Sequence, residues 1–173
     1  LQHYFPVFQE EIQYKKDITA FVESNPDCFE RILQKGHITA SAWLLNKDCS
    51  KALLMHHAKL NAWFQLGGHC DGDSDVLRVA IKEAQEESGI NGIEAVTDEI
   101  FDIDIHLIPE NKKEKAHYHY DVRFLLRVNS DELVVQNQES KELRWISKDV
   151  AALPTQERSI LRMFNKWIKL IYC

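Results

Sequence analysis

Residues 67–90 read GGHCDGDSDVLRVAIKEAQEESGI, and this stretch decides how the chain is interpreted. Two glycines open an acidic loop, which leads into a helix predicted over residues 73–88. The helix carries Glu83, Glu86 and Glu87, which share one side because they are spaced at i, i+3 and i+4. Three carboxylates this close repel one another as anions. A divalent metal, or a metal with a phosphate chain, would explain this arrangement, although an acidic helix face taken alone is more often a solvated surface.

The size and charge of the chain limit its class. It has 173 residues and a formal net charge of −6, which fits one domain with a substantial core. No basic block is present, so we expect no extended nucleic acid as a partner, because phosphate-backbone binding needs clustered lysine and arginine. No apolar run is long enough to span a membrane, so we expect no membrane partner. A homodimer stays open.

The four cysteines show no CxxC spacing, which argues against a disulfide scaffold or a structural zinc site built from cysteines. No signal peptide is visible. We therefore expect a cytoplasmic protein with reduced thiols.

Helical and strand patterns alternate along the chain and predict an α/β layered domain with a mixed sheet. Residues 1–36 are predicted to form an N-terminal helical extension packed on a core domain of residues 37–173. We expect helices at 8–24, 28–35, 73–88, 147–152 and 157–171, and strands at 37–46, 51–57, 100–107, 117–127, 133–135 and 142–146.

A polar strand face adds candidate binding residues. His117 and His119 project to the same side of one predicted strand, and His106 lies on the strand expected to pair with it. Two interpretations stay open: the wall of a substrate pocket, and a polar sheet face satisfied within the protein. His69 follows the double glycine, where it could contact a phosphate or be ordinary loop polarity.

The segment 68–90 resembles the Nudix box of Nudix hydrolases, which joins a glycine to a cluster of glutamates at fixed spacing. The positions in register are Gly68, Glu83, Ala84, Glu86, Glu87, Gly89 and Ile90. Two positions depart from the box: Ser74 replaces a glutamate and Lys82 replaces an arginine. Asp71, Asp73 or Asp75 could stand in for the missing carboxylate. The resemblance implies a Nudix-like α/β/α sandwich.

The resemblance also implies roles for individual residues. Mg²⁺, with Mn²⁺ as the alternative ion, would be held by Glu83, Glu86, Glu87 and the carbonyl of Gly67. The general base would be Glu83 or a carboxylate of a later loop, Glu139 or Glu142. Substrate contacts are assigned to Gly68, His69 and His119.

The activity implied is Mg²⁺-dependent cleavage of a pyrophosphate bond in a nucleoside diphosphate linked to another moiety, such as a nucleotide sugar. Ser74 and Lys82 motivate an alternative, a non-catalytic Nudix-like module that binds a nucleotide or metabolite, because lysine lacks the planar bidentate fork of arginine. A second alternative is an isomerase on the same fold that acts on an isoprenoid diphosphate and uses Cys70. Turnover and its products distinguish the hydrolase, the binding module and the isomerase.

Overall fold

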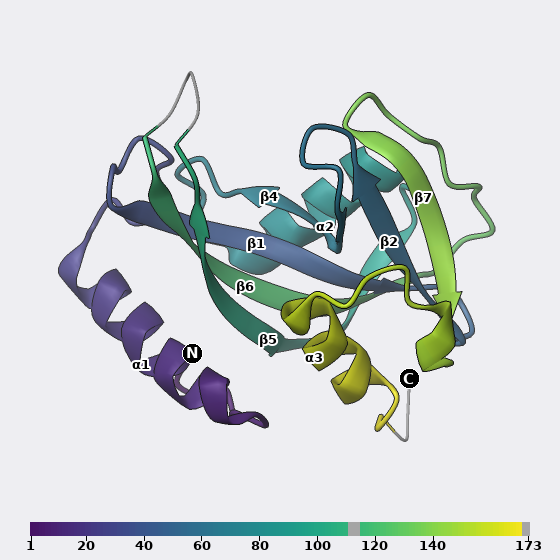
Figure 1. The fold of residues 1–173 in the computed structure, drawn as a ribbon, viewed down its shortest axis with the longest axis horizontal. Helices are drawn as coiled ribbons and strands as arrows, with labels where there is room; N and C mark the ends of the chain where they lie inside the picture. The colour runs from purple at the N-terminus through teal and green to yellow at the C-terminus, as the bar shows by residue number, and fades with distance from the viewer. Residues whose placement is uncertain (111–114, 171–173) are drawn as a thin grey trace.

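A mixed seven-stranded sheet organises the described part of the molecule, residues 1–110 and 115–170 of this computed structural model (Figure 1). The strands run in the order β3-β2-β1-β6-β5, and β4 and β7 add to β1 and β2. The strands are β1 (Gly36–Leu45), β2 (Lys51–His57), β3 (Trp63–Phe64), β4 (Leu66–His69), β5 (Ile93–Ile108), β6 (His117–Val128) and β7 (Ser140–Ser147). The helices are α1 (Gln9–Ser24), α2 (Val76–Ser88) and α3 (Arg158–Trp167), with a short 3₁₀ helix η1 (Val150–Ala152).

Strand β1 is the centre of the fold, and all ten of its residues are buried. It runs parallel to β6 and antiparallel to β2 and β4, which makes the sheet mixed as predicted. Ala40 and Ala42 pack in one hydrophobic cluster with α2, whereas Trp43 packs in a second cluster with α3. Figure 1 shows α2 and α3 on opposite sides of the sheet. The predicted α/β/α sandwich with an N-terminal helix is confirmed.

The helices predicted at 28–35 and 157–171 differ from the structure. Residues 28–35 form turns instead of a helix, and the amide of Ile38 donates to the carbonyl of Cys28 at 2.7 Å. Gly36 does not end a helix. It begins β1 at φ +142°, where an added Cβ would lie 2.2 Å from the carbonyl oxygen of Tyr118 on β6. Helix α3 is shorter than predicted, and the expected end at residue 171 lies outside the described residues. Within the described residues, no helix is both long and apolar enough to cross a membrane.

The strand predicted at 133–135 is wrong, because this segment meets the end of α2 and not a neighbouring strand. The amide of Val135 donates to the carbonyl of Ser88 at 2.7 Å, and Leu133 is exposed. The helix predicted at 147–152 is reduced to η1, which is capped by Asp149. The division of the chain at residue 36 stays a prediction.

The predicted hairpin is confirmed, and its polar face lies inside the protein. Strands β5 and β6 pair antiparallel, with register shifts between Ala95 and Asp102. Asp102 and Asp104 are buried beneath α3, whose Arg162 donates to both carboxylates at 2.8–3.0 Å. This part of the face is therefore satisfied by ion pairs within the chain.

Among the cysteines that the structure describes, Cys49 differs from the expectation. Cys28 and Cys70 are buried free thiols, but Cys49 is disulfide-bonded. The expectation of fully reduced cysteines is therefore wrong at Cys49. Spacing alone did not reveal this disulfide, because a disulfide depends on which chain segments meet in space.

Candidate active site

Helix α2 positions the predicted metal ligands through well-formed ends. It begins after Asp75, whose carboxylate accepts from the amide of Arg78 at 3.1 Å, and it ends at Gly89 in the left-handed conformation. Ala80 and Ala84 are fully buried against the sheet. The helix is thereby held rigidly, with its glutamates beside the buried stripe.

The two glycines of β4 allow the backbone to approach both β1 and α2. Gly67 adopts φ +154°, and an added Cβ would lie 2.6 Å from the Cα of Ser41. At Gly68 an added Cβ would lie 2.4 Å from a carboxylate oxygen of Glu83. The amide of Gly67 also donates to Glu87 Oε2 at 2.8 Å. The double glycine therefore brings strand β4 directly against two of the glutamates and orients one of them.

The carboxylates of α2 line a cavity of about 360 Å³ together with the loop before β7. The lining residues are Glu83, Glu86, Glu87, Asn137, Gln138 and Glu139. Sequence reasoning did not single out Asn137 or Gln138, because neither amide carries a spacing signal.

The two late-loop candidates for the general base are in different positions. Glu139 reaches the cavity of the α2 glutamates. Glu142 lies on β7 opposite His56, and it accepts from Arg144 Nε at 2.7 Å. The structure therefore brings Glu139, and not Glu142, to the carboxylate cluster.

Burial is the main influence on the electrostatics of the cavity. Burial raises the pKa of Glu87 to about 8, with smaller contributions from Glu83 and Glu139, against the hydrogen bond from Gly67. Burial and the charge of Glu86 raise the pKa of Glu83 as well. The nearby cation is Lys82, whose Nζ lies 3.7 Å from Glu86 Oε1, and both of these side chains are more than half exposed. Clustered carboxylate oxygens of this kind are the donor set that a hard divalent cation takes, so the residues fit one.

No aspartate of the acidic loop replaces the carboxylate missing at Ser74. Asp71 pairs with Arg31, with Oδ2 accepting from Nη2 at 2.5 Å. Asp73 accepts from Arg78 Nη2 at 2.7 Å, and Asp75 caps α2. All three carboxylates are thus already paired within the chain, and none of them lines the cavity.

The predicted substrate contacts His69 and His119 lie in a cluster of histidines. The ring centroid of His119 is 5.1 Å from that of His69 and 4.8 Å from that of His37. Burial lowers the pKa of His119 to about 2 and that of His37 to about 4, with further contributions from neighbouring histidines. His37 was not singled out from the sequence, because only the parallel pairing of β1 with β6 places it here.

Cys70 is poorly suited to the isomerase alternative. Its side chain is buried, and burial raises the pKa of the thiol to about 12, with smaller contributions from Asp121 and Asp73. The thiol is therefore protonated at neutral pH, which is the unreactive form.

Comparison with known proteins establishes the family. Residues 35–168 match the NUDIX domain family. A relative named "Probable DHNTP pyrophosphohydrolase", from Lactococcus lactis subsp. cremoris (strain MG1363), is 28% identical over 152 residues, which cover 87% of this chain and 86% of the relative. The crystal structure of a NUDIX-family hydrolase from Clostridium perfringens is similar, with a TM-score of 0.58 and 26% identity over 76% of this chain and 96% of that chain. An Ap4A hydrolase from C. elegans shares the fold, with a TM-score of 0.59 and 18% identity over 76% of this chain and 94% of that chain.

The family match covers well over half of the chain, so this protein belongs to the Nudix family. Its enzyme class is that of the Nudix pyrophosphohydrolases. Members of this family typically use a divalent metal and act on small molecules derived from nucleotides.

Proposed function

We propose that this protein cleaves a pyrophosphate bond in a nucleoside diphosphate linked to another moiety, such as a nucleotide sugar, and that it uses Mg²⁺, with Mn²⁺ as the alternative ion. The observation that carries this proposal is the cavity in which three glutamates of α2 meet Glu139. Two of these carboxylates, the buried Glu87 and the partly buried Glu83, have raised pKa values, and such groups bind a divalent cation in place of protons.

The ligands in this proposal are Glu83, Glu86 and Glu87, with the carbonyl of Gly67. When bound, Mg²⁺ neutralises phosphate charge and acidifies a water. Glu87 is held in place by the amide of Gly67, and Glu83 is held against the backbone of Gly68. These contacts orient the carboxylates before substrate arrives, which reduces the reorganisation required on binding.

Glu139 and Glu83 are the two candidates for the general base in this proposal. Both line the cavity, and the charge of Glu139 contributes to the raised pKa of Glu83. Glu142 is a weaker candidate, because its carboxylate is already bound to Arg144.

The similar proteins support a substrate that carries a phosphate chain. The names of the Lactococcus lactis relative and of the C. elegans structure refer to DHNTP and to Ap4A, and a structure of similar fold is an E. coli dihydroneopterin triphosphate pyrophosphohydrolase. What these names share is the phosphate chain and not the group attached to it. The attached moiety is therefore the part of the proposal that a substrate panel has to resolve.

The test measures phosphate-containing products from a panel of nucleotide sugars, ADP-ribose, Ap4A, dihydroneopterin triphosphate and nucleoside triphosphates, each with Mg²⁺ and with Mn²⁺. We expect metal-dependent cleavage of at least one nucleoside diphosphate derivative. The variant Glu83→Gln should lower turnover by about 100-fold or more, because it removes a charged ligand from the metal site.

Glu142→Gln is the matched control, because it makes the same chemical change at a glutamate outside the cavity. It should retain most of the turnover, whereas Glu139→Gln should lose it if Glu139 is the base. Cleavage of only the pterin or dinucleoside substrates would overturn the substrate class proposed here. Metal binding without turnover on any compound would instead favour the non-catalytic binding module.

A further inference from the structure

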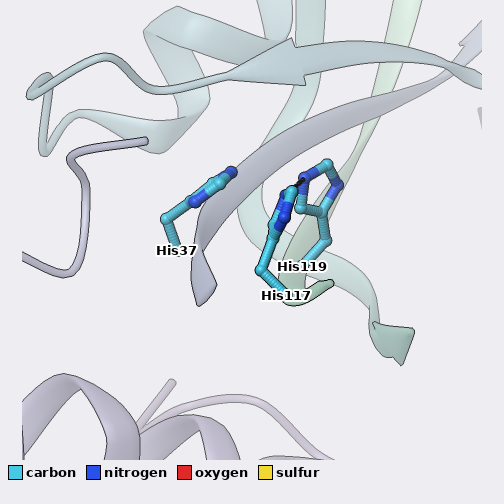
Figure 2. A group of neighbouring side chains, drawn as sticks. All are labelled: His37, His117 and His119. Carbon is cyan, nitrogen blue, oxygen red and sulfur yellow. Dashed lines mark hydrogen bonds between the residues drawn. The ribbon is translucent and has the colours of Figure 1, made fainter. Parts of the chain in front are cut away.

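Three histidine side chains converge at one end of the sheet, outside the carboxylate cavity. Figure 2 shows His37 from β1 beside His117 and His119 from β6. One ring nitrogen of each lies within 4.8 Å of those of the other two. His37 and His117 are buried, and His119 is partly buried. Neutral imidazole nitrogens grouped in this way are typical ligands of a transition-metal ion.

The strand pairing explains why the three side chains meet. His37 is the register partner of His119 in the parallel β1–β6 pair, so both side chains project from the same face. His117 lies two residues before His119 on β6 and therefore also faces that side. Rigid, paired strands thus carry all three imidazoles, which is how precise metal sites are built.

The spacing of the two β6 imidazoles matches metal coordination. Nε2 of His117 lies 3.3 Å from Nε2 of His119. Two Zn–N bonds of about 2.0–2.1 Å at a tetrahedral angle place their nitrogens roughly 3.3 Å apart.

His37 supplies an independent indication that a ligand binds here. Its side chain is 2% exposed, and among the described residues neither Nδ1 nor Nε2 has a hydrogen-bond partner. A buried polar group without a partner destabilises the folded protein. Coordination of a metal would give one of these two nitrogens a partner.

His117 is already held in the orientation that metal binding requires. Its Nδ1 lies 2.8 Å from the carbonyl oxygen of Lys115, so a neutral ring that donates Nδ1–H to this carbonyl carries a lone pair on Nε2. A second-sphere hydrogen bond of this kind sets the tautomer and direction of histidine ligands. Nε2 is the atom that faces His119.

We propose that His37, His117 and His119 form a second metal site, which binds Zn²⁺ through three imidazole nitrogens. Its all-nitrogen donor set differs from the carboxylate oxygens of α2, so the two sites select different ions. The proposal gives His119 a role as metal ligand in place of the substrate contact expected from the sequence. It does not depend on the pyrophosphatase proposal, because binding is measured without substrate.

The experiment titrates the metal-stripped full chain with Zn²⁺ against a chromophoric chelator, in a large excess of Mg²⁺ that occupies the carboxylate site. We expect one Zn²⁺ per chain. His117→Gln should lower Zn²⁺ affinity by at least about 10-fold, which is the loss seen even when outer-sphere partners of a metal site are removed. His3→Gln, at an exposed histidine outside the cluster, is the matched control and should bind as the wild type does.

Two further readouts locate the ion. Co²⁺ in place of Zn²⁺ should give the intense visible absorption of tetrahedral nitrogen coordination, which octahedral carboxylate sites lack. Imidazole ¹⁵N spectra of the wild type should show Zn²⁺-induced shifts at His37, His117 and His119, a measurement that remains decisive if a variant fails to fold. Absence of stoichiometric Zn²⁺ binding, an unchanged affinity in folded His117→Gln, or shifts confined to other histidines would each overturn the proposal.

Discussion

Two groups of carboxylates, one fully buried and one that includes the partly buried Glu83, have opposite electrostatic properties. Asp102 and Asp104 lie beneath α3, and Glu83 and Glu87 lie on α2. Burial by itself raises the pKa of a carboxyl group in both places. At Asp102, the hydrogen bond from Arg162 and the charges of neighbouring cations outweigh burial and hold the pKa below its usual range. At Glu87 no such cation is near, and the pKa rises to about 8.

The difference lies in where the counter-charge comes from. The Asp102 group is balanced from within the chain, because Arg162, Lys166 and Arg123 all donate to Asp102 at 2.6–3.1 Å. Lys166 also bonds Glu11 of α1, so the network joins four separate elements, α1, β5, β6 and α3. Glu83 and Glu87 have no such set of buried cations, so a proton or a metal ion supplies the missing positive charge. A buried acidic cluster thus indicates a ligand site only where the chain supplies no cations.

The largest effect on stability is expected from removing a cation that pairs with Asp102 and Asp104. Arg162→Met should lower the free energy of unfolding by about 3–5 kcal/mol, because Asp102 and Asp104 would remain buried with too little positive charge. Urea denaturation at neutral pH measures this loss. Arg127→Ala breaks the partly exposed pair with Glu94 and is the control, with an expected loss below about 1 kcal/mol. Equal losses in the two variants would show that the buried network contributes no more than a surface pair.

On α2, in the absence of metal, a substitution that removes a carboxyl group should stabilise the protein, which is the opposite of the effect expected for Arg162→Met. The pKa of Glu87 is about 8 in the folded protein against an ordinary value of 4.5, so the folded state keeps a proton that the unfolded chain releases. Stability therefore falls as pH rises from about 4.5 to about 8, by at most about 1.4 kcal/mol per pH unit from this group. Glu87→Gln should remove this slope, so in EDTA its melting temperature should exceed that of the wild type by a margin that widens up to about pH 8.

Two controls accompany the Glu87 measurement. Saturating Mg²⁺ should stabilise the wild type more than Glu87→Gln and narrow the margin, because the ion binds the folded state. Glu142→Gln should show no widening, since the hydrogen bond from Arg144 lowers the pKa of Glu142. A margin that stays constant across this pH range would show that Glu87 is not the group that titrates.

The smallest effect is expected on turnover, from a substitution of Lys82 beside the glutamates of α2. Lys82→Arg should raise turnover by up to about 5-fold, since a planar guanidinium can hold a neighbouring glutamate through two hydrogen bonds while an exposed pair contributes less than about 1 kcal/mol. Steady-state kinetics on the substrate found in the panel measures the change. Lys51→Arg, an exposed lysine at the start of β2, should leave turnover unchanged. Lower turnover in Lys82→Arg would show that Lys82 has a role of its own.

Local features were predictable from the sequence, and features that depend on strand pairing were not. Helix α2, the double glycine and the hairpin of β5 and β6 follow from spacing and alternation. The helix expected at 28–35 failed because its residues form turns held to β1 by the bond between Ile38 and Cys28. Likewise, the sequence could not choose between Glu139 and Glu142, because the path of the loop before β7 decides which of them reaches α2.

The sequence by itself determined the Nudix box, its glutamates on one helix face and the α/β class, because helix periodicity and strand alternation depend on near neighbours in the chain. The tertiary structure decided which acidic residues gain a cation and which histidines meet. The charge of Asp102 is balanced because α3 places Arg162 against it, although the two residues are 60 positions apart in the sequence. His37 and His119 become neighbours only through the parallel pairing of β1 and β6. Charge balance and metal coordination depend on distances of a few ångströms between remote segments, and those distances are properties of the packed fold.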